Sequence, residues 1–142
     1  MSAHETLLEL FAIAGIMVLT SATHILGLWA LEPACKRFIG YGRRHHHGLF
    51  LLVLALTLLC LHTVEIVEYA LLYWRVGALP TYETALYFSA DAYSTIGGLE
   101  IHLPHRWRLV GSFEGVNGMV LIGWSTAFLF AAWRDILRPP ED

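Results

Sequence analysis

The stretch TYETALYFSADAYSTIGGLE, residues 81–100, joins a short helical pattern to a segment that cannot continue as an ordinary helix. Pro80 fits the first turn of a helix, and Glu83 in that turn suits the positive end of the helix dipole. The pattern then predicts about three and a half helical turns, too short and too polar to cross a membrane. It stops at Thr95, where two adjacent glycines follow.

Irregular backbone at membrane depth is tolerated only where it is buried in protein or lines a water-filled cavity. The TIGGLE segment, residues 95–100, is irregular backbone of this kind if it lies within a bilayer. The stretch therefore predicts a re-entrant loop, in which a short helix enters the membrane and the chain returns. A surface turn in an ordinary outer loop is the alternative, because Gly-Gly turns are common.

The composition is that of a membrane protein. Of the 142 residues, 56% are hydrophobic and 15% are charged, and the mean hydropathy is +0.56. The net charge of −3 predicts no nucleic-acid partner, and no polar stretch is long enough to build a soluble domain. We therefore expect neither an enzyme nor a site for a small-molecule substrate.

Three apolar segments are long enough to cross a bilayer, which takes roughly 20 residues of helix. They cover residues 7–31, 49–74 and 115–133. The sequence thus predicts an all-α membrane protein with three transmembrane helices, lipid as its surroundings and one re-entrant loop. We divide the chain into residues 1–48, an extra helix with a basic loop, and residues 49–142, a two-helix unit.

The distribution of Lys and Arg predicts the orientation. The loop 32–48 and the C-terminal tail are basic, whereas the N-terminus before the first apolar segment has no Lys or Arg. The positive-inside rule therefore places the N-terminus outside and the C-terminus in the cytoplasm. The residues behind this prediction are Lys36, Arg37, Arg43, Arg44, Arg134 and Arg138. The run His45 to His47 in the same loop is interpreted as solvated, with pH sensing as the alternative.

The run ALYFSADAYSTIGGLEIHLPHRWRLVGSFEGVNG, residues 85–118, resembles the pore module of potassium channels. In that family a pore helix leads into a selectivity filter usually written TVGYGD. The resemblance covers about residues 50–135 and implies a pore helix, a filter and an inner helix. The matches to the threonine, the valine, the first glycine and the acidic residue of the filter are Thr95, Ile96, Gly97 and Glu100.

The resemblance to small bacterial ion-channel proteins implies a homotetramer in the bacterial inner membrane, because one loop cannot surround an ion. It implies K⁺ or Na⁺ as permeant ions and no other cofactor. It also implies that Tyr87 and Phe88 brace the filter and that Asp91 shares a proton or water with Glu100. The alternative for Asp91 is a hydrogen bond within its own surroundings.

Two residues depart from the filter of the family. Gly98 occupies the position of the filter tyrosine, and Leu99 occupies the position of the second filter glycine. Filter carbonyls replace the hydration shell of the ion, and leucine pays a steric penalty at left-handed backbone angles that glycine adopts freely. The resemblance, with these departures, therefore implies a passive cation channel with weak or lost K⁺ selectivity. The alternative is a non-conducting, potassium-channel-like subunit with a structural or sensing role.

The third apolar segment matches the pore-lining inner helix of the family. It contains Gly118 and Gly123. These glycines either allow the helix to bend or allow close packing against another helix.

Ionisable residues interrupt the second apolar segment. His62, Glu65 and Glu68 lie on one broad helix face, and at this depth they should face protein or water rather than lipid. We interpret them as a hydrogen-bonded anchor that fixes the short helix to the second segment, with a cation or proton site as the alternative. A metal site is disfavoured, because His and Glu of this helix alone give too few ligands.

Two mid-segment histidines, His24 and His62, are of the right type for the axial ligands of a membrane haem protein. Counted from the inner ends of the predicted helices, they lie seven and thirteen residues deep, or roughly 10 Å and 20 Å. Depths this different do not suit one iron, so a haem-binding redox protein is the least favoured alternative.

Overall fold

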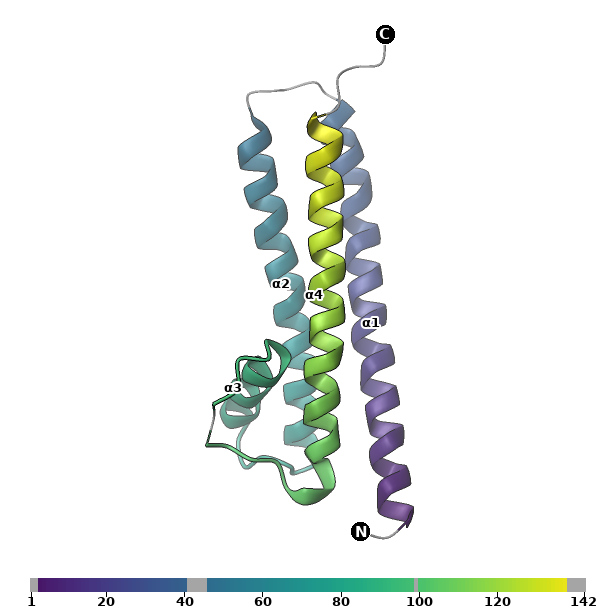
Figure 1. The fold of residues 1–142 in the computed structure, drawn as a ribbon, viewed down its shortest axis with the longest axis vertical. Helices are drawn as coiled ribbons and strands as arrows, with labels where there is room; N and C mark the ends of the chain where they lie inside the picture. The colour runs from purple at the N-terminus through teal and green to yellow at the C-terminus, as the bar shows by residue number, and fades with distance from the viewer. Residues whose placement is uncertain (1–2, 41–45, 99, 138–142) are drawn as a thin grey trace.

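Three long helices lie side by side along the length of the molecule (Figure 1). They are α1 (Ala3–Gly40), α2 (His47–Arg75) and α4 (Arg108–Leu137), and a 3₁₀ turn, η2 (His105–Trp107), precedes α4. The computed structural model describes residues 3–40, 46–98 and 100–137. For these residues the all-helical class is confirmed, as are three helices long and apolar enough to cross a membrane.

The outer surface of the helices is apolar. Phe11, Val18 and Phe130 have exposed fractions of 74%, 70% and 67%. Contiguous apolar surface of this kind is rare on soluble monomers, and it suits contact with hydrocarbon. The helices are therefore compatible with an integral membrane protein. The orientation of the termini stays a prediction.

Two predicted boundaries are corrected, because α1 and α4 are both longer than their apolar segments. α1 continues to Gly40 through most of the predicted loop 32–48. Lys36 therefore lies on the helix, where its ammonium pairs with Glu32 one turn earlier at 2.6 Å. α4 begins at Arg108, before the predicted start at residue 115. Apolar content marks only the part of a helix suited to hydrocarbon, and on α1 an i,i+4 ion pair supports the helix beyond it.

The histidine run falls at the start of α2. His47 begins the helix, and its ring lies edge-on to Phe38 of α1 with centroids 6.2 Å apart. His45 lies outside the described residues.

The short helix predicted from residues 81–94 is confirmed as α3 (Tyr82–Tyr93). It packs against α2 and α4, and the chain then returns to the end of the bundle where α2 ends (Figure 1). Its N-cap is Thr81, whose side-chain oxygen accepts a hydrogen bond from Thr84 N–H at 3.1 Å. Pro80 therefore precedes the cap instead of lying in the first turn, where Glu83 does lie.

The carboxyl end of α3 closes in a Schellman motif. The N–H of Thr95 donates to Ala92 O at 3.1 Å, and the N–H of Ile96 donates to Asp91 O at 3.2 Å. This motif requires a left-handed residue at the position of Thr95, and Thr95 has φ of 56°. A β-branched residue there is strained. The helical pattern therefore stops at Thr95 because the chain reverses its handedness there.

Replacing Thr95 with glycine is expected to raise the free energy of unfolding by about 1 kcal/mol, because glycine adopts this conformation without steric cost. Thermal unfolding of the protein in detergent, followed by circular dichroism, measures the change. The control is Ser94→Gly, because Ser94 has φ of −79° and gains nothing from glycine. A lower stability for Thr95→Gly than for Ser94→Gly would contradict the strain argument.

Glycines let α3 lie directly on the backbone of α4. A Cβ at Gly115 would lie 3.1 Å from the backbone oxygen of Ala92, and one at Gly118 would collide with the backbone oxygen of Tyr93. A Cβ at Gly123, in contrast, would meet nothing within 4 Å. Close packing therefore accounts for Gly118. α4 is continuous past both glycines, so the proposed bending of the inner helix stays a prediction.

α1 is tied to the start of α4 through Glu9. Its Oε1 atom accepts a hydrogen bond from Leu109 N–H at 3.0 Å, and the residue is only 2% exposed. The first N–H groups of a helix have no partner within the helix, and a carboxylate there also suits the helix dipole. Glu9 therefore interrupts the apolar segment of α1 because it caps another helix.

Candidate functional site

The segment that follows α3 is exposed in this single chain. Ile96 has an exposed fraction of 79%, and Glu100 is exposed as well. Thr95 and Gly97 have positive φ, and Ile96 between them does not. Gly98, directly after Gly97, also has positive φ, at 98°. The backbone thus alternates in handedness over residues 95–97 and stops alternating at Gly98. Leu99 lies outside the described residues.

The predicted braces of this segment lie in different surroundings. The ring of Phe88 packs edge-on against Tyr73 of α2, with centroids 5.4 Å apart. Tyr87 is 61% exposed and points away from the core of this chain. Asp91 is half-buried and Glu100 is exposed, and among the described residues their side chains make no hydrogen bond with one another. The Asp91–Glu100 pair therefore stays a prediction.

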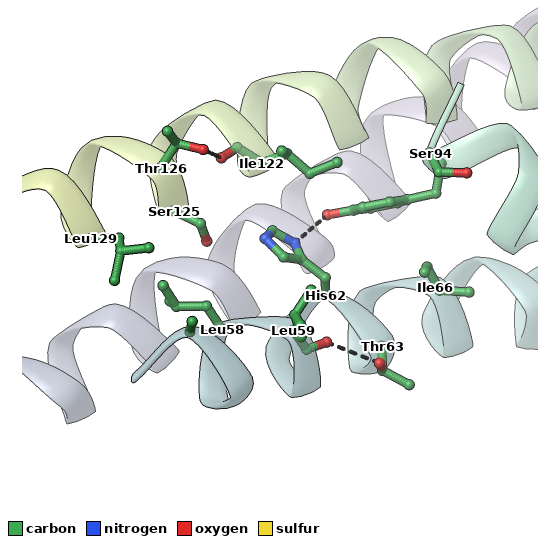
Figure 2. Close-up of a pocket in the computed structure, with 12 residues that line it drawn as sticks. Leu58, Leu59, His62, Thr63, Ile66, Ser94, Ile122, Ser125, Thr126 and Leu129 are labelled. Carbon is green, nitrogen blue, oxygen red and sulfur yellow. Dashed lines mark hydrogen bonds between the residues drawn. The ribbon is translucent and has the colours of Figure 1, made fainter. Parts of the chain in front are cut away.

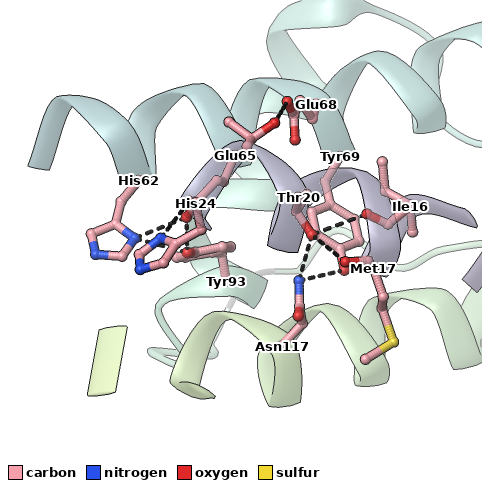
Figure 3. Close-up of polar contacts among 11 residues, drawn as sticks. Ile16, Met17, Thr20, His24, His62, Glu65, Glu68, Tyr69, Tyr93 and Asn117 are labelled. Carbon is pink, nitrogen blue, oxygen red and sulfur yellow. Dashed lines mark hydrogen bonds and ion pairs between the residues drawn. The ribbon is translucent and has the colours of Figure 1, made fainter. Parts of the chain in front are cut away.

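A buried carboxylate, Glu65, gathers side chains from three helices (Figure 3). Its Oε1 atom lies 2.7 Å from His24 Nδ1, and its Oε2 atom lies 2.9 Å from His62 Nδ1. The hydroxyl of Tyr93 donates to Oε2 as well. Glu65 therefore joins α1 and α3 to α2, which agrees with the predicted anchor for the short helix.

The two histidines lie at the same depth, which corrects the depths estimated from the sequence. α1 continues to Gly40, and α2 begins at His47. His24 and His62 therefore each lie roughly 15 residues, or about 23 Å, from that end of their own helix. Their ring centroids are 5.4 Å apart. A haem between them would have to displace Glu65, whose carboxylate bridges both rings.

A second polar contact joins α1 to α2 one turn further along. Glu68 Oε1 accepts a hydrogen bond from the hydroxyl of Thr23 at 2.6 Å. The other carboxylate oxygen, Oε2, is buried without a partner among the described residues. Glu68 therefore belongs to the same face as Glu65, as predicted, but it lies outside the cluster that Glu65 gathers.

A third contact brings in α4 through Asn117. Its side-chain nitrogen donates to Thr20 Oγ1 at 2.7 Å and to the hydroxyl of Tyr69 at 3.2 Å (Figure 3). Thr20 and Tyr69 are both fully buried. The three long helices therefore meet at one hydrogen-bonded point.

A separate carboxylate, Glu114, joins α2, α3 and α4. The hydroxyl of Tyr73 donates to Glu114 Oε2 at 2.6 Å, and the hydroxyl of Ser89 lies 2.5 Å from Oε1. All three residues have an exposed fraction of 0%. Glu114 thus fixes the middle of α3, whereas Glu65 fixes its carboxyl end.

Sequence reasoning missed the partners of these carboxylates. The sequence suggests His24 only as a haem ligand and gives no role to Asn117. Glu114 falls one residue before the predicted third segment, in the connection between the second and third segments. A polar residue within a long apolar helix was the available signal, because such residues pair with one another inside the bundle.

A cavity of about 500 Å³ opens between α2 and α4 beside the carboxyl end of α3 (Figure 2). Its lining is mostly apolar, and His62 and Tyr93 form part of its wall. Ser125 of α4 also lines it, with a buried hydroxyl that has no partner among the described residues. The Glu65 cluster therefore borders an open groove through His62.

Comparison with known proteins identifies no relative: no family model, no curated protein and no solved structure matches the chain. Any assignment of function thus depends on the residues of the chain itself.

Proposed function

We propose that the chain is one subunit of a passive cation channel with a potassium-channel-like pore. The observation that carries the proposal is the exposed segment 95–98, which begins with alternating backbone handedness at the carboxyl end of a short helix. Successive carbonyls turn to one side when backbone handedness alternates, and carbonyl rings are what coordinate dehydrated cations. The carboxyl end of a helix also carries partial negative charge, which favours cations.

The contacts that hold α3 in place support the same proposal. Glu65 holds its carboxyl end through Tyr93, Glu114 holds its middle through Ser89, and the glycine face of α4 lies beneath it. A helix held by buried hydrogen bonds and direct backbone packing keeps the segment after it at a fixed place. A filter requires such a fixed support, because its oxygens must stay in position as ions pass.

One segment cannot surround an ion, so the proposed channel is a homotetramer in which α3 enters the membrane from the outer side. Four copies would bring the exposed residues 95–98 together around an axis. Four copies of Glu100 would then form an acidic ring at the outer mouth, favouring cations over anions. Because alternation of handedness stops at Gly98, fewer ordered carbonyl rings would act on the ion. The channel should therefore discriminate poorly between K⁺ and Na⁺.

Flux through reconstituted liposomes, measured for K⁺, Na⁺ and Ca²⁺, tests the proposal once a tetramer has been identified by mass. We expect K⁺ and Na⁺ to pass at rates within about tenfold of one another, since an ion that keeps its water is selected only weakly. Glu100→Gln should weaken the preference for cations. The matched control is Glu83→Gln, which removes an exposed carboxylate at the start of α3 instead of at its end.

The double variant Gly98→Tyr, Leu99→Gly restores the pattern of the family and should raise K⁺ selectivity. Strong K⁺ selectivity of the unaltered protein would contradict the argument from residues 98 and 99. A folded tetramer that passes no cation would overturn conduction itself and favour the non-conducting, structural or sensing subunit.

A further inference from the structure

We propose that His24, His62 and Glu65 form a binding site for a divalent transition-metal ion, with Zn²⁺ as the expected occupant. Each side chain offers one ligand atom, and the three atoms lie within 4.8 Å of one another. Two imidazole nitrogens and a carboxylate oxygen are a donor set that Zn²⁺ binds in proteins, whereas Ca²⁺ and Mg²⁺ prefer oxygen alone. The site does not depend on whether the chain conducts ions.

The charge of Glu65 supports a bound cation. The carboxylate is fully buried, and its ion-pair partners among the described residues are the two histidines. Two neutral imidazoles would leave one negative charge unbalanced in the interior, which is costly. A divalent ion balances that charge. A proton on one histidine is the competing solution, and it is distinguished by whether metal is retained.

The orientation of His24 suits this role. Its ring stacks on Trp124 of α4, with centroids 5.9 Å apart and planes 19° apart, so that Nδ1 faces Glu65. Its Nε2 atom is buried without a partner among the described residues. A metal-bound imidazole carries its hydrogen on the second nitrogen and donates it to an acceptor. Among the described residues His24 Nε2 has no such acceptor in place, because the buried hydroxyl of Ser125, the residue after Trp124, is likewise without a partner.

Tyr93 and the groove complete the site. The hydroxyl of Tyr93 donates to Glu65, the kind of contact that fixes the orientation of a metal-binding carboxylate. His62 lines the cavity of about 500 Å³ between α2 and α4, which leaves room for a water in the fourth position of a tetrahedral site. The bound ion would tie α1 directly to α2 and, through Tyr93, to α3.

Metal content of the purified full chain tests the inference. The run His45 to His47 can bind metal at the surface, so the test uses the background His45→Ser, His46→Ser, His47→Ser. This protein is incubated with Zn²⁺ in detergent and freed of unbound metal by gel filtration. We expect about one Zn²⁺ per chain by elemental mass spectrometry, and a higher unfolding temperature with Zn²⁺ than with a chelator.

His24→Gln should weaken Zn²⁺ binding by at least tenfold, because it removes one ligand, while His102→Gln should retain the metal. His102 is exposed and lies outside the cluster. Co²⁺ added to the background protein provides a check that needs no further variant, since a tetrahedral site gives a visible absorption band. Zn²⁺ content that is insensitive to His24→Gln, or a folded background protein that retains no metal and shows no Co²⁺ band, would overturn the inference. None of these measurements involves ion flux.

Discussion

Replacing Glu114 with alanine is expected to lower the free energy of unfolding by about 3 kcal/mol, because two buried hydroxyls lose an acceptor. Most of this loss of stability comes from the hydroxyl of Tyr73. Its hydroxyl donates to Glu114 at 2.6 Å and has no exposed surface through which water could replace that bond. Ser89 is affected less, because its hydroxyl can still donate to Ile66 O at 2.8 Å. Thermal unfolding in detergent, followed by circular dichroism, measures the loss.

Two variants separate this explanation from a general effect of losing a carboxylate. Glu114→Gln keeps one acceptor oxygen and should cost less than Glu114→Ala. Glu83→Ala removes an exposed carboxylate from α3 and should change stability by about 0.5 kcal/mol or less. If Glu114→Ala costs no more than Glu83→Ala, the contacts of Glu114 do not stabilise the bundle.

Gly118→Ala is expected to destabilise the protein by about 1–3 kcal/mol, the usual cost of overpacking a buried contact. The added methyl group would collide with the backbone oxygen of Tyr93 and lie 3.0 Å from Cγ of its ring. Backbone cannot move aside as a flexible side chain can, so α3 must shift away from α4. That shift would also disturb the hydrogen bond from Tyr93 to Glu65.

The matched control is Gly123→Ala on the same helix, where the added methyl group meets nothing within 4 Å. It should stabilise α4 slightly, because alanine is favoured over glycine in a helix by up to about 1 kcal/mol. Equal stability changes for the two variants would contradict the packing argument. A loss of ion flux for Gly123→Ala without a loss of stability would support bending of the inner helix at this position.

The long helices could be predicted from the sequence because crossing a bilayer demands a long apolar run, which few other structures show. The short helix α3 could be predicted because its acidic first turn, its length and its stop all lie within residues 81–95, whereas its N-cap at Thr81 was missed because Pro80 suggested an earlier start. The ends of α1 and α4 could not, since both helices continue through polar residues that apolar content does not register. The error at the end of α1 then misplaced His24, because its depth was counted from that end.

The partners of the buried polar groups could not be predicted from one sequence either. Helical periodicity places Glu65 and Glu68 on one face, but it does not say which neighbouring helix covers that face. The contact between Glu65 and His24 depends on how α1 is rotated and how far it slides along α2. Both are decided by side-chain packing between helices, which leaves no local pattern in either segment.

The hydrogen bond between Glu9 and Leu109 has a consequence for when the polar groups of α1 find their partners during synthesis. Synthesis runs from the N-terminus, so α1 leaves the ribosome carrying Glu9, Thr20 and His24 before their partners on α2 and α4 exist. Thr20 can already donate to Ile16 O within α1. The partner of His24, Glu65, is made 41 residues later. Asn117 follows Thr20 by 97 residues, and Leu109 follows Glu9 by 100 residues. A lone helix with such groups is costly to leave in lipid. In a bilayer, the polar groups of α1 would therefore be fully satisfied only once α4 has packed against it.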